Sequence, residues 1–314
     1  MAINRQLLSE DAVGLIDYRE DFTNGADGTR LFWRVCGPED ADTPALICCD
    51  GIGCDGYAWK YLVRDFGDKH RILRWHYRGH GQSDAPSDLA RVTFDDLCDD
   101  LAAVMNAAGI TRGILLGHSM GVQVALEFHR RQKDRVQGLV LLCGSHGLPL
   151  DTFRDSDIAK KIFPLVAATF EGLPVAGRAV WSTLIGTELA FRLAMRFELN
   201  GEFVHRDDFF PYLQHLSQMD PRVFVGILRH AAEHSAFDHL PNVDVPTLVI
   251  AGERDNFTPA RLSREMQARI PGGELLMIPA GTHTAPIEMP DLVTLRFEKW
   301  LLTHFSQNAK YQAA

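Results

Sequence analysis

A serine between two glycines is the feature of this chain that points most directly to chemistry. The segment Gly117-His118-Ser119-Met120-Gly121 fits the Gly-x-Ser-x-Gly pattern, in which a strand turns sharply into a helix and exposes the serine hydroxyl. The glycines are needed because side chains would collide in so tight a turn. An apolar run at 114–116 leads into the motif, and a helical pattern at 122–128 follows it. This context favours a nucleophilic Ser119 over a glycine-serine turn without chemistry.

A serine hydroxyl needs a base to take its proton and a carboxylate to orient that base. In a parallel sheet, such groups lie in loops at the carboxyl ends of the strands. Asp255 directly follows the predicted strand 247–251, whereas Asp244 precedes that strand and would lie at the wrong end. Among the thirteen histidines, His283 is the one that follows the last predicted strand and precedes the closing helix. We therefore expect Asp255 to orient His283, with a helix cap ahead of Thr258 as the alternative role of Asp255.

Acyl transfer also needs backbone N–H groups that bind the developing oxyanion. Met120 follows the serine at the start of a helix and is the first expected donor. Ile52 is the second, because the segment Asp50-Gly51-Ile52-Gly53 follows the predicted strand 45–49 and its glycines allow close approach to a ligand. An ordinary turn is the alternative for this segment.

Other nucleophiles and metal ligands have less support in the sequence. The six cysteines lack the spacing of a disulfide framework and stand in no nucleophile motif, which is typical of reduced core thiols. Cys54 is the thiol of most interest, because it lies in the glycine-rich loop. His230 and His234 are four residues apart, a spacing that could hold zinc, but no third ligand accompanies them. We expect no cofactor and no metal, and we expect His118 to be structural.

Short apolar runs alternate with helical patterns along the chain, which is typical of a mostly parallel sheet flanked by helices. Seven segments are predicted as strands: 31–35, 45–49, 71–77, 113–117, 138–143, 247–251 and 274–278. A helix is predicted at 93–109, where Thr93 and Asp96 resemble an N-terminal cap. Further helices are predicted at 122–128, 261–270 and 291–305.

The alternation of strands and helices stops after Cys143. From 148 to 239, aromatic and aliphatic residues recur among charged ones and no buried strand is predicted, which indicates an inserted helical cap. The predicted organisation is therefore a core in two parts, 1–147 and 240–314, with a cap at 148–239.

Length and charge restrict the classes of function. The 314 residues are 46% hydrophobic, enough for a sizeable core, and a net charge of -9 without a basic cluster disfavours nucleic acid and anionic membranes as partners. No membrane span is predicted, and the first thirty residues lack the apolar run of a secretory signal. We expect a cytoplasmic protein that acts on a small molecule; the sequence leaves the oligomeric state open, with a homo-oligomer as one alternative.

The chain resembles the α/β-hydrolase superfamily, specifically its capped esterase, lipase, lactonase and cofactor-free perhydrolase branch. The order Ser119, Asp255, His283 matches the family order of nucleophile, acid and histidine. Two segments add to the resemblance, Tyr77-Arg78-Gly79-His80-Gly81-Gln82-Ser83 and Pro286-Ile287-Glu288-Met289-Pro290. The resemblance covers the chain from about Leu31 onward. It implies an α/β-hydrolase fold with a mostly parallel eight-stranded sheet, flanking helices and an inserted helical cap.

One departure from the family pattern concerns charge. Many relatives carry a histidine before the first glycine of the oxyanion loop, where this chain has Asp50. An unpaired carboxylate there would oppose the negative charge that develops during catalysis. We hypothesise that Arg78, near the end of the neighbouring strand, pairs with Asp50.

The expected reaction is hydrolysis of carboxylic esters with apolar acyl or aryl groups, through an acyl-enzyme intermediate. Relatives that act on epoxides or haloalkanes normally have aspartate at the nucleophile position, so Ser119 argues against both. Perhydrolase or haloperoxidase-like, lactonase and carbon–carbon hydrolase activities on the same three residues remain open. A small-molecule receptor with a hydrolase fold is the alternative from a different class.

Overall fold

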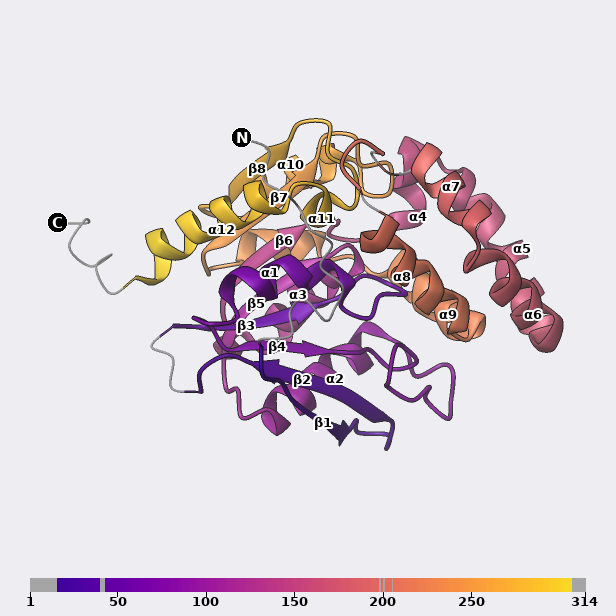
Figure 1. Ribbon diagram of the computed structural model, residues 1–314, viewed down its shortest axis with the longest axis horizontal. Coiled ribbons are helices and arrows are strands. Elements are labelled where there is room, and N and C mark those ends of the chain that lie inside the picture. Colours follow the sequence, from indigo (N-terminus) through magenta and orange to yellow (C-terminus); the bar gives the residue numbers. More distant parts are fainter. Residues whose placement is uncertain (1–15, 40–42, 198, 200, 205, 307–314) are drawn as a thin grey trace.

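The computed structural model describes residues 16–39, 43–197, 199, 201–204 and 206–306. The predictions for the first 15 and the last eight residues, which belong to the two parts of the predicted core, lie outside the described residues. The centre of the fold is an eight-stranded sheet with the order β1-β2-β4-β3-β5-β6-β7-β8 (Figure 1). Strand β2 runs antiparallel to both of its neighbours, and the strands from β4 to β8 run parallel. The predicted mostly parallel eight-stranded sheet is therefore confirmed.

All seven predicted strands are present in this sheet. The strands are β1 (Arg19–Asn24), β2 (Arg30–Cys36), β3 (Ala45–Cys49), β4 (Ile72–Trp75), β5 (Gly113–His118), β6 (Val136–Leu142), β7 (Thr247–Gly252) and β8 (Glu274–Ile278). Strand β4 is shorter than the predicted 71–77. The additional strand β1 lies at the edge of the sheet, and none of its residues is buried. It therefore lacks the buried apolar run by which the other strands were predicted.

Side chains of each central strand alternate between two cores, one on each face of the sheet. In β5, Leu115 belongs to one cluster of buried residues, while Ile114 and Leu116 belong to the other. Helices α2 and α3 cover the Leu115 face, and helices α1 and α12 cover the opposite face. The helices of the core are α1 (Lys60–Phe66), α2 (Phe94–Ala107), α3 (Met120–Arg131), α10 (Ala260–Arg269), α11 (Ala285–Glu288) and α12 (Pro290–Phe305).

Helix α2 begins with the N-terminal capping residues, Thr93 and Asp96, that the sequence predicts. The Thr93 side chain accepts a hydrogen bond from the backbone N–H of Asp96, and the Asp96 carboxylate accepts one from the backbone N–H of Thr93. This reciprocal capping satisfies two N–H groups that have no partner within the helix. The predicted helix boundary is therefore confirmed.

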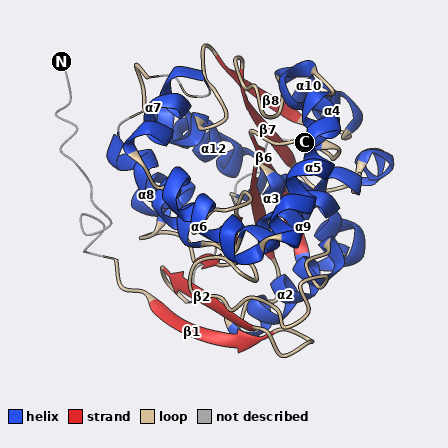
Figure 2. Cartoon of the chain, turned by 90° about the vertical axis from the view of Figure 1, so that its right-hand side faces the viewer, coloured by secondary structure: helices blue, strands red, loops and turns tan. Residues whose placement is uncertain are grey.

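The segment predicted as a cap lies between β6 and β7, and its described regular structure consists of helices joined by turns and short loops. Its helices are α4 (Pro149–Thr152), α5 (Ile158–Gly172), α6 (Pro174–Ile185), α7 (Glu188–Phe197), α8 (Arg206–Gln218) and α9 (Pro221–Glu233). Figures 1 and 2 agree that α5 to α9 gather at one end of the sheet. The division of the chain into a core and a separate cap domain stays a prediction.

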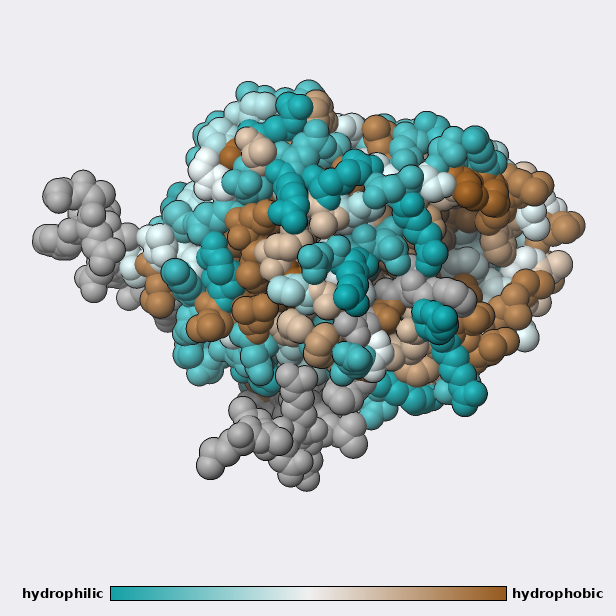
Figure 3. Space-filling view, turned by 90° about the horizontal axis from the view of Figure 1, so that it is seen from above, coloured by the Kyte–Doolittle hydropathy of each residue, from teal (hydrophilic) through white to brown (hydrophobic). Residues whose placement is uncertain are grey.

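Apolar side chains are exposed on the outer helices of this segment. Figure 3 shows brown, apolar surface at the end of the molecule where Figure 1 places α5, α6 and α7. The most exposed of these side chains are Leu165 in α5, Val175 in α6 and Leu189 in α7. Contiguous apolar surface of this kind is typical of binding regions rather than of inert surface.

Candidate active site

Ser119 lies at the tip of a sharp turn between β5 and α3. Its backbone has φ 57° and ψ −120°, a conformation that is costly for a residue with a side chain. The turn also needs both flanking glycines. A Cβ atom at Gly121 would lie 2.0 Å from the Cys49 carbonyl oxygen, and one at Gly117 would lie 2.4 Å from the Gly121 carbonyl oxygen. The strained backbone and the two close approaches are features of a nucleophile elbow.

The structure brings together the three residues that the sequence predicts as a triad. The Oγ atom of Ser119 lies 2.8 Å from Nε2 of His283. On the other side of the imidazole, Nδ1 of His283 lies 2.9 Å from Oδ2 of Asp255. His283 follows β8 and Asp255 follows β7, so both reach the serine from the carboxyl ends of parallel strands. This geometry allows a neutral imidazole to take the serine proton while the carboxylate holds its tautomer.

The carboxylate of Asp255 is itself held by the turn that follows it. Its Oδ1 accepts hydrogen bonds from the backbone N–H groups of Phe257 and Thr258, and its Oδ2 accepts one from the Thr258 hydroxyl at 2.8 Å. Asp255 is 5% exposed. The two roles considered for Asp255, turn cap and histidine partner, are therefore compatible. Sequence reasoning treated Thr258 only as part of a helix start and missed its contact with the candidate triad.

His118 lies inside the motif, and its imidazole contacts the backbone of the loop that carries His283. Its Nε2 lies 3.0 Å from the backbone oxygen of His283. Burial lowers the pKa of His118 to about 4, and the neighbouring His283 adds to this effect. A neutral His118 can donate to that carbonyl and support the loop that carries His283, in agreement with the structural role predicted for it.

The expected oxyanion donors flank Ser119. Met120 is the first residue of α3, and a Cβ atom at Gly51 would lie only 3.1 Å from the Ser119 Cβ, so the loop that contains Ile52 packs against the serine. The next amide in this loop is already engaged, since the Gly53 N–H donates to Nε2 of His80 at 2.9 Å. Among the described residues, the N–H groups of Ile52 and Met120 have no hydrogen-bond acceptor. Both remain predicted donors.

The hypothesis that Arg78 pairs with Asp50 is wrong. Arg78 forms two 2.7 Å hydrogen bonds with the buried carboxylate of Asp100, and its Nη1 donates to Asp27 at 2.9 Å. These partners lie on the α2 side of the sheet.

The environment of Asp50 is instead formed by Trp59 and Arg74. The Trp59 Nε1–H donates to Oδ1 of Asp50 at 2.5 Å. Burial raises the pKa of Asp50 to about 7, and the charge of Arg74 partly opposes this rise. Neither residue was singled out from the sequence. The Asp50 carboxyl group, beside the predicted oxyanion loop, is therefore mostly protonated at pH values below this raised pKa.

Comparison with known proteins identifies the family to which this chain belongs. The sequence profile of the family described as alpha/beta hydrolase fold matches residues 44–290, well over half of the chain. The chain belongs to the α/β-hydrolase fold family. Over 266 residues it is 25% identical to 3-oxoadipate enol-lactonase 1 of Acinetobacter baylyi, which covers 84% of this chain and 90% of that protein.

Solved structures agree with the family match. An enol-lactonase from Burkholderia xenovorans has a TM-score of 0.73 at 21% identity, covering 90% of this chain and 99% of that chain. A thermophilic esterase from Thermogutta terrifontis has a TM-score of 0.71 at 26% identity, covering 92% of this chain and 100% of that chain. With the family match, these similarities identify a hydrolase of the α/β fold. None of the helices that the structure describes combines the length and apolar character that a membrane span requires.

The cysteines of this α/β-hydrolase are poor candidates for nucleophiles. All six are buried and free, and burial raises the pKa of the Cys54 thiol well above its ordinary value. The Cys54 Sγ lies 3.7 Å from the Ile52 carbonyl oxygen, inside the loop rather than toward a ligand. Because the thiolate is the reactive form, a thiol with a raised pKa is inert near neutral pH.

His234, one member of the histidine pair with zinc-like spacing, is engaged with protein groups. Its Nε2 lies 3.1 Å from a Glu127 carboxylate oxygen and its Nδ1 lies 3.1 Å from the Gln123 amide nitrogen. The imidazole also stacks on the Phe94 ring, with centroids 4.2 Å apart. These contacts connect α9 to α2 and α3, so they explain His234 as a packing residue of this α/β-hydrolase.

An apolar groove of about 520 Å³ is connected to the imidazole of His283 by two successive ring contacts. The ring of Phe257 packs against that imidazole at 4.9 Å between centroids, and the ring of Phe153 packs against Phe257 at 5.2 Å. Phe153 is part of the groove wall, and the remaining apolar wall residues are Leu150, Ile158, Ala159, Ile162, Phe163 and Val166. A continuous path of apolar contacts therefore leads from the candidate triad to the exposed face of α5.

Proposed function

We propose that this α/β-hydrolase cleaves carboxylic esters with apolar acyl or aryl groups through an acyl-enzyme intermediate on Ser119. The observation that carries the proposal is the contact of Ser119 Oγ with His283 Nε2 at 2.8 Å, with Asp255 Oδ2 2.9 Å from the other ring nitrogen. A serine, a histidine and a carboxylate in this arrangement form the constellation that activates a serine hydroxyl for acyl transfer.

In the proposed reaction, Ser119 Oγ attacks the ester carbonyl carbon while His283 Nε2 takes its proton. The oxyanion that forms accepts hydrogen bonds from the N–H groups of Met120 and Ile52. His283 then gives the proton to the departing alcohol, leaving the acyl group on the serine. Water attacks this acyl-enzyme in the same way, and the carboxylic acid is released.

The apolar groove supports the choice of substrate. Among its described wall residues Arg154 is the only charged one, and the wall residue Phe153 contacts Phe257, which in turn contacts His283. Burial of apolar surface supplies about 25 cal/mol per Å², so a longer acyl chain in this groove should bind more tightly. We further propose that residues 148–239 act as a cap, since α4 and α5 supply this wall.

Lactones are a second candidate class of substrate. The sequence relative from Acinetobacter baylyi and the structure from Burkholderia xenovorans are both named enol-lactonases. A lactone is a cyclic ester, so its carbonyl carbon would be attacked by the same hydroxyl. With a lactone the leaving alcohol stays attached to the acyl group.

The test combines a substrate series with labelling of the nucleophile. Initial rates are measured on p-nitrophenyl esters from acetate to decanoate and, separately, on a γ-lactone. The esters should be turned over, and kcat/KM should rise with acyl length over the first members of the series. Turnover of the γ-lactone would support the second class of substrate. A fluorophosphonate probe, mapped by mass spectrometry, should label Ser119. Ser119→Ala should lower kcat/KM by about 10³-fold or more while the thermal unfolding midpoint stays close to that of the wild type.

Ser263→Ala is the matched control, because Ser263 is also a buried serine but its hydroxyl has no hydrogen-bond partner among the described residues, the candidate triad included. It should retain nearly full activity. Near-full activity of Ser119→Ala, or labelling at another residue, would refute the proposal.

A further inference from the structure

Residues 50–56, which include the predicted oxyanion donor Ile52, are held by residues 74–80, at and beyond the end of β4. Three side chains of 74–80 donate hydrogen bonds to backbone carbonyl oxygens of 50–56: Arg74 to Gly56 at 3.0 Å, His76 to Asp55 at 3.2 Å and the Tyr77 hydroxyl to Asp50 at 2.9 Å. His80 makes a contact of the opposite kind, because its Nε2 accepts the Gly53 N–H at 2.9 Å. One segment of the chain therefore positions the loop that lies beside the candidate nucleophile.

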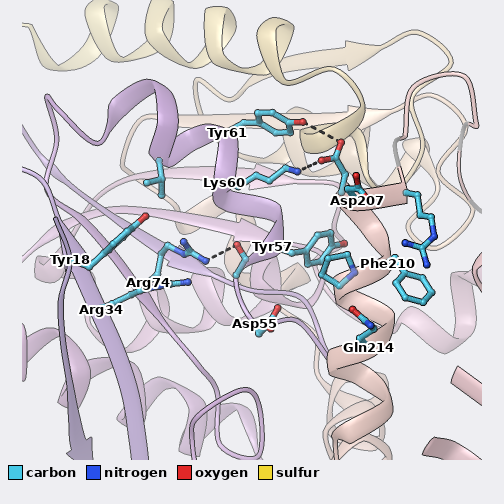
Figure 4. Close-up of a pocket in the computed structure, with 15 residues that line it drawn as sticks. Tyr18, Arg34, Asp55, Tyr57, Lys60, Tyr61, Arg74, Asp207, Phe210 and Gln214 are labelled. Carbon is cyan, nitrogen blue, oxygen red and sulfur yellow. Dashed lines mark hydrogen bonds and ion pairs between the residues drawn. The ribbon is translucent and has the colours of Figure 1, made fainter. Parts of the chain in front are cut away.

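One end of this loop borders a cavity of about 540 Å³, and Figure 4 shows Asp55, Tyr57 and Arg74 on the cavity wall. A Cβ atom at Gly56 would lie 2.3 Å from Nη2 of Arg74, so the guanidinium lies directly against the backbone of the loop. On the cavity side, the loop is therefore supported by hydrogen bonds more than by packing.

The His80 contact acts on the peptide group next to the predicted donor. The Ile52 N–H belongs to the peptide group between Gly51 and Ile52, whose carbonyl oxygen accepts the Cys54 N–H at 3.3 Å. The following peptide group, between Ile52 and Gly53, is held at its N–H by His80 and at its carbonyl oxygen by the Cys54 thiol, at 3.7 Å. Gly53 has φ 73°, and glycine changes φ at little cost, so this peptide group needs a partner to keep one orientation. Because the two peptide groups share the Ile52 Cα atom, the His80 contact also restricts the direction of the Ile52 N–H.

The partners of His80 determine its tautomer. Its Nδ1 lies 3.1 Å from the Arg78 carbonyl oxygen, which can only accept, so Nδ1 carries the hydrogen and Nε2 is left to accept from Gly53. The side chain of Arg78 is itself fixed by Asp100 and Asp27. His80 is fully buried, and burial lowers its pKa to about 4. The imidazole of His80 therefore stays neutral at the pH values at which a histidine base acts.

We propose that His80 is a positioning residue for the proposed ester hydrolysis, and that its Nε2 holds the loop so that the Ile52 N–H points at the oxyanion formed on Ser119. In this role His80 acts through the backbone of the loop and not on the substrate. A Cβ atom at Gly51 would lie 3.1 Å from the Ser119 Cβ, so a small rotation of the loop changes the geometry at the nucleophile. The inference rests on the proposed function, because the oxyanion forms only if Ser119 attacks a carbonyl carbon.

Two substitutions separate the two contacts of His80. His80→Gln places an amide oxygen near the position of Nε2, so it can still accept the Gly53 N–H. His80→Asn reaches only the position of Nδ1, so it can still donate to the Arg78 carbonyl but leaves the Gly53 N–H without its acceptor.

Steady-state kinetics on p-nitrophenyl butyrate compares these two variants with the wild type. Because removal of an oxyanion donor lowers kcat by about 10²–10³-fold, a misdirected donor in His80→Asn should lower kcat by about tenfold or more. The KM should stay within about twofold, since the ground-state ester carries no oxyanion. His80→Gln should keep kcat within about threefold of the wild type.

Two further measurements distinguish a change of position from a loss of folding. A hexyl trifluoromethyl ketone forms an adduct with a serine nucleophile that carries an oxyanion, so its inhibition constant should rise in His80→Asn by the factor by which kcat/KM falls. Amide hydrogen exchange of residues 50–56, followed by mass spectrometry, should be faster in His80→Asn than in the wild type and unchanged in His80→Gln. If the His80→Asn protein does not fold, His80→Ala takes its place, since alanine also lacks the acceptor.

His70→Asn is the matched control. His70 precedes β4, at the end of the parallel strands opposite to Ser119, and its Nδ1 also contacts a backbone oxygen, that of Pro44, at 3.2 Å. This variant should keep the kcat and the KM of the wild type.

Three results would overturn the positioning role of His80. These are a wild-type kcat in folded His80→Asn, equal losses of kcat in His80→Asn and His80→Gln, and a loss that appears in KM alone. The proposed function fails in a different way, because the wild type itself would then not turn over esters. Ester turnover by the wild type that His80→Asn fully retains would refute the positioning role and leave the proposed function intact.

Discussion

Replacing Asp50 by asparagine should change how the free energy of unfolding depends on pH. Asp50 is 3% exposed, and its Oδ1 accepts the Trp59 Nε1–H at 2.5 Å. An asparagine can accept the same hydrogen bond through its own Oδ1, so the variant keeps the contact and loses only the titration. Burial raises the pKa of Asp50 from 3.8 to about 7 in the folded protein, against the opposing charge of Arg74.

The sign of the effect follows from proton binding. Between pH 3.8 and about 7, the folded Asp50 holds a proton that the unfolded one has lost. The free energy of unfolding therefore falls as the pH rises through this window. The stabilising contribution is fully present below pH 3.8 and is lost as the pH rises through the folded pKa. Between pH 5 and pH 8, the loss amounts to about 2.5 kcal/mol.

Urea denaturation of the wild type and Asp50→Asn at pH 5, 6, 7 and 8 measures this difference. Relative to the wild type, the variant should become more stable by about 2.5 kcal/mol between pH 5 and pH 8. Asp68→Asn is the control, since Asp68 is exposed in the turn after α1. Its stability should parallel the wild type at every pH. If the free energy of unfolding of Asp50→Asn also parallels that of the wild type at every pH, the raised pKa of Asp50 and the electrostatic argument built on it are refuted.

Three further substitutions test the turn at Ser119 and the Arg78–Asp100 ion pair by the same urea method. Gly121→Ala should destabilise the fold by about 2–3 kcal/mol, because its Cβ would lie 2.0 Å from the Cys49 carbonyl oxygen. Gly172→Ala is the control, because Gly172 ends α5 and a Cβ there would meet open space. It should stabilise the fold by about 0.5–1 kcal/mol. Similar losses of unfolding free energy in both variants would contradict the steric argument. Arg78→Met should cost about 3–5 kcal/mol because it leaves the fully buried Asp100 unpaired, and a cost below about 1 kcal/mol would count against that pairing.

Most of the sheet could be predicted because buried strands carry their signal locally. Strands β5 and β7 are buried at every position, and each contains a continuous apolar run, 114–116 in β5 and 248–251 in β7. Strand β1 is different because it pairs on one side only and has no buried residue. It pairs with β2 across the turn that joins the two strands, and a strand without a buried face leaves no hydrophobic alternation in the sequence.

The candidate triad could be predicted from the Gly-x-Ser-x-Gly motif together with the order of the elements. Ser119, Asp255 and His283 each follow a parallel strand, and the carboxyl ends of such strands meet at one edge of the sheet. The contacts that hold Asp255 could not be found in this way. The Thr258 hydroxyl reaches the Asp255 carboxylate only because the turn after β7 folds back on itself, and the conformation of such a turn is not encoded by hydrophobic periodicity.

The wrong partner assigned to Asp50 has a specific geometric cause. Residues that alternate along a strand share a face, so Asp50 continues the row of Leu46 and Cys48, which belong to the core on the α1 and α12 side. Arg74 continues the row of Ile72 in β4, and Ile72 belongs to the same core. Arg78 lies beyond the end of β4, where the alternation no longer applies, and it turns toward α2 on the opposite face. Counting faces along β3 and β4 would therefore have selected Arg74 as the charge that acts on Asp50. The Trp59 donor reaches Asp50 from the segment just before α1, so its position required the folded loop between β3 and that helix.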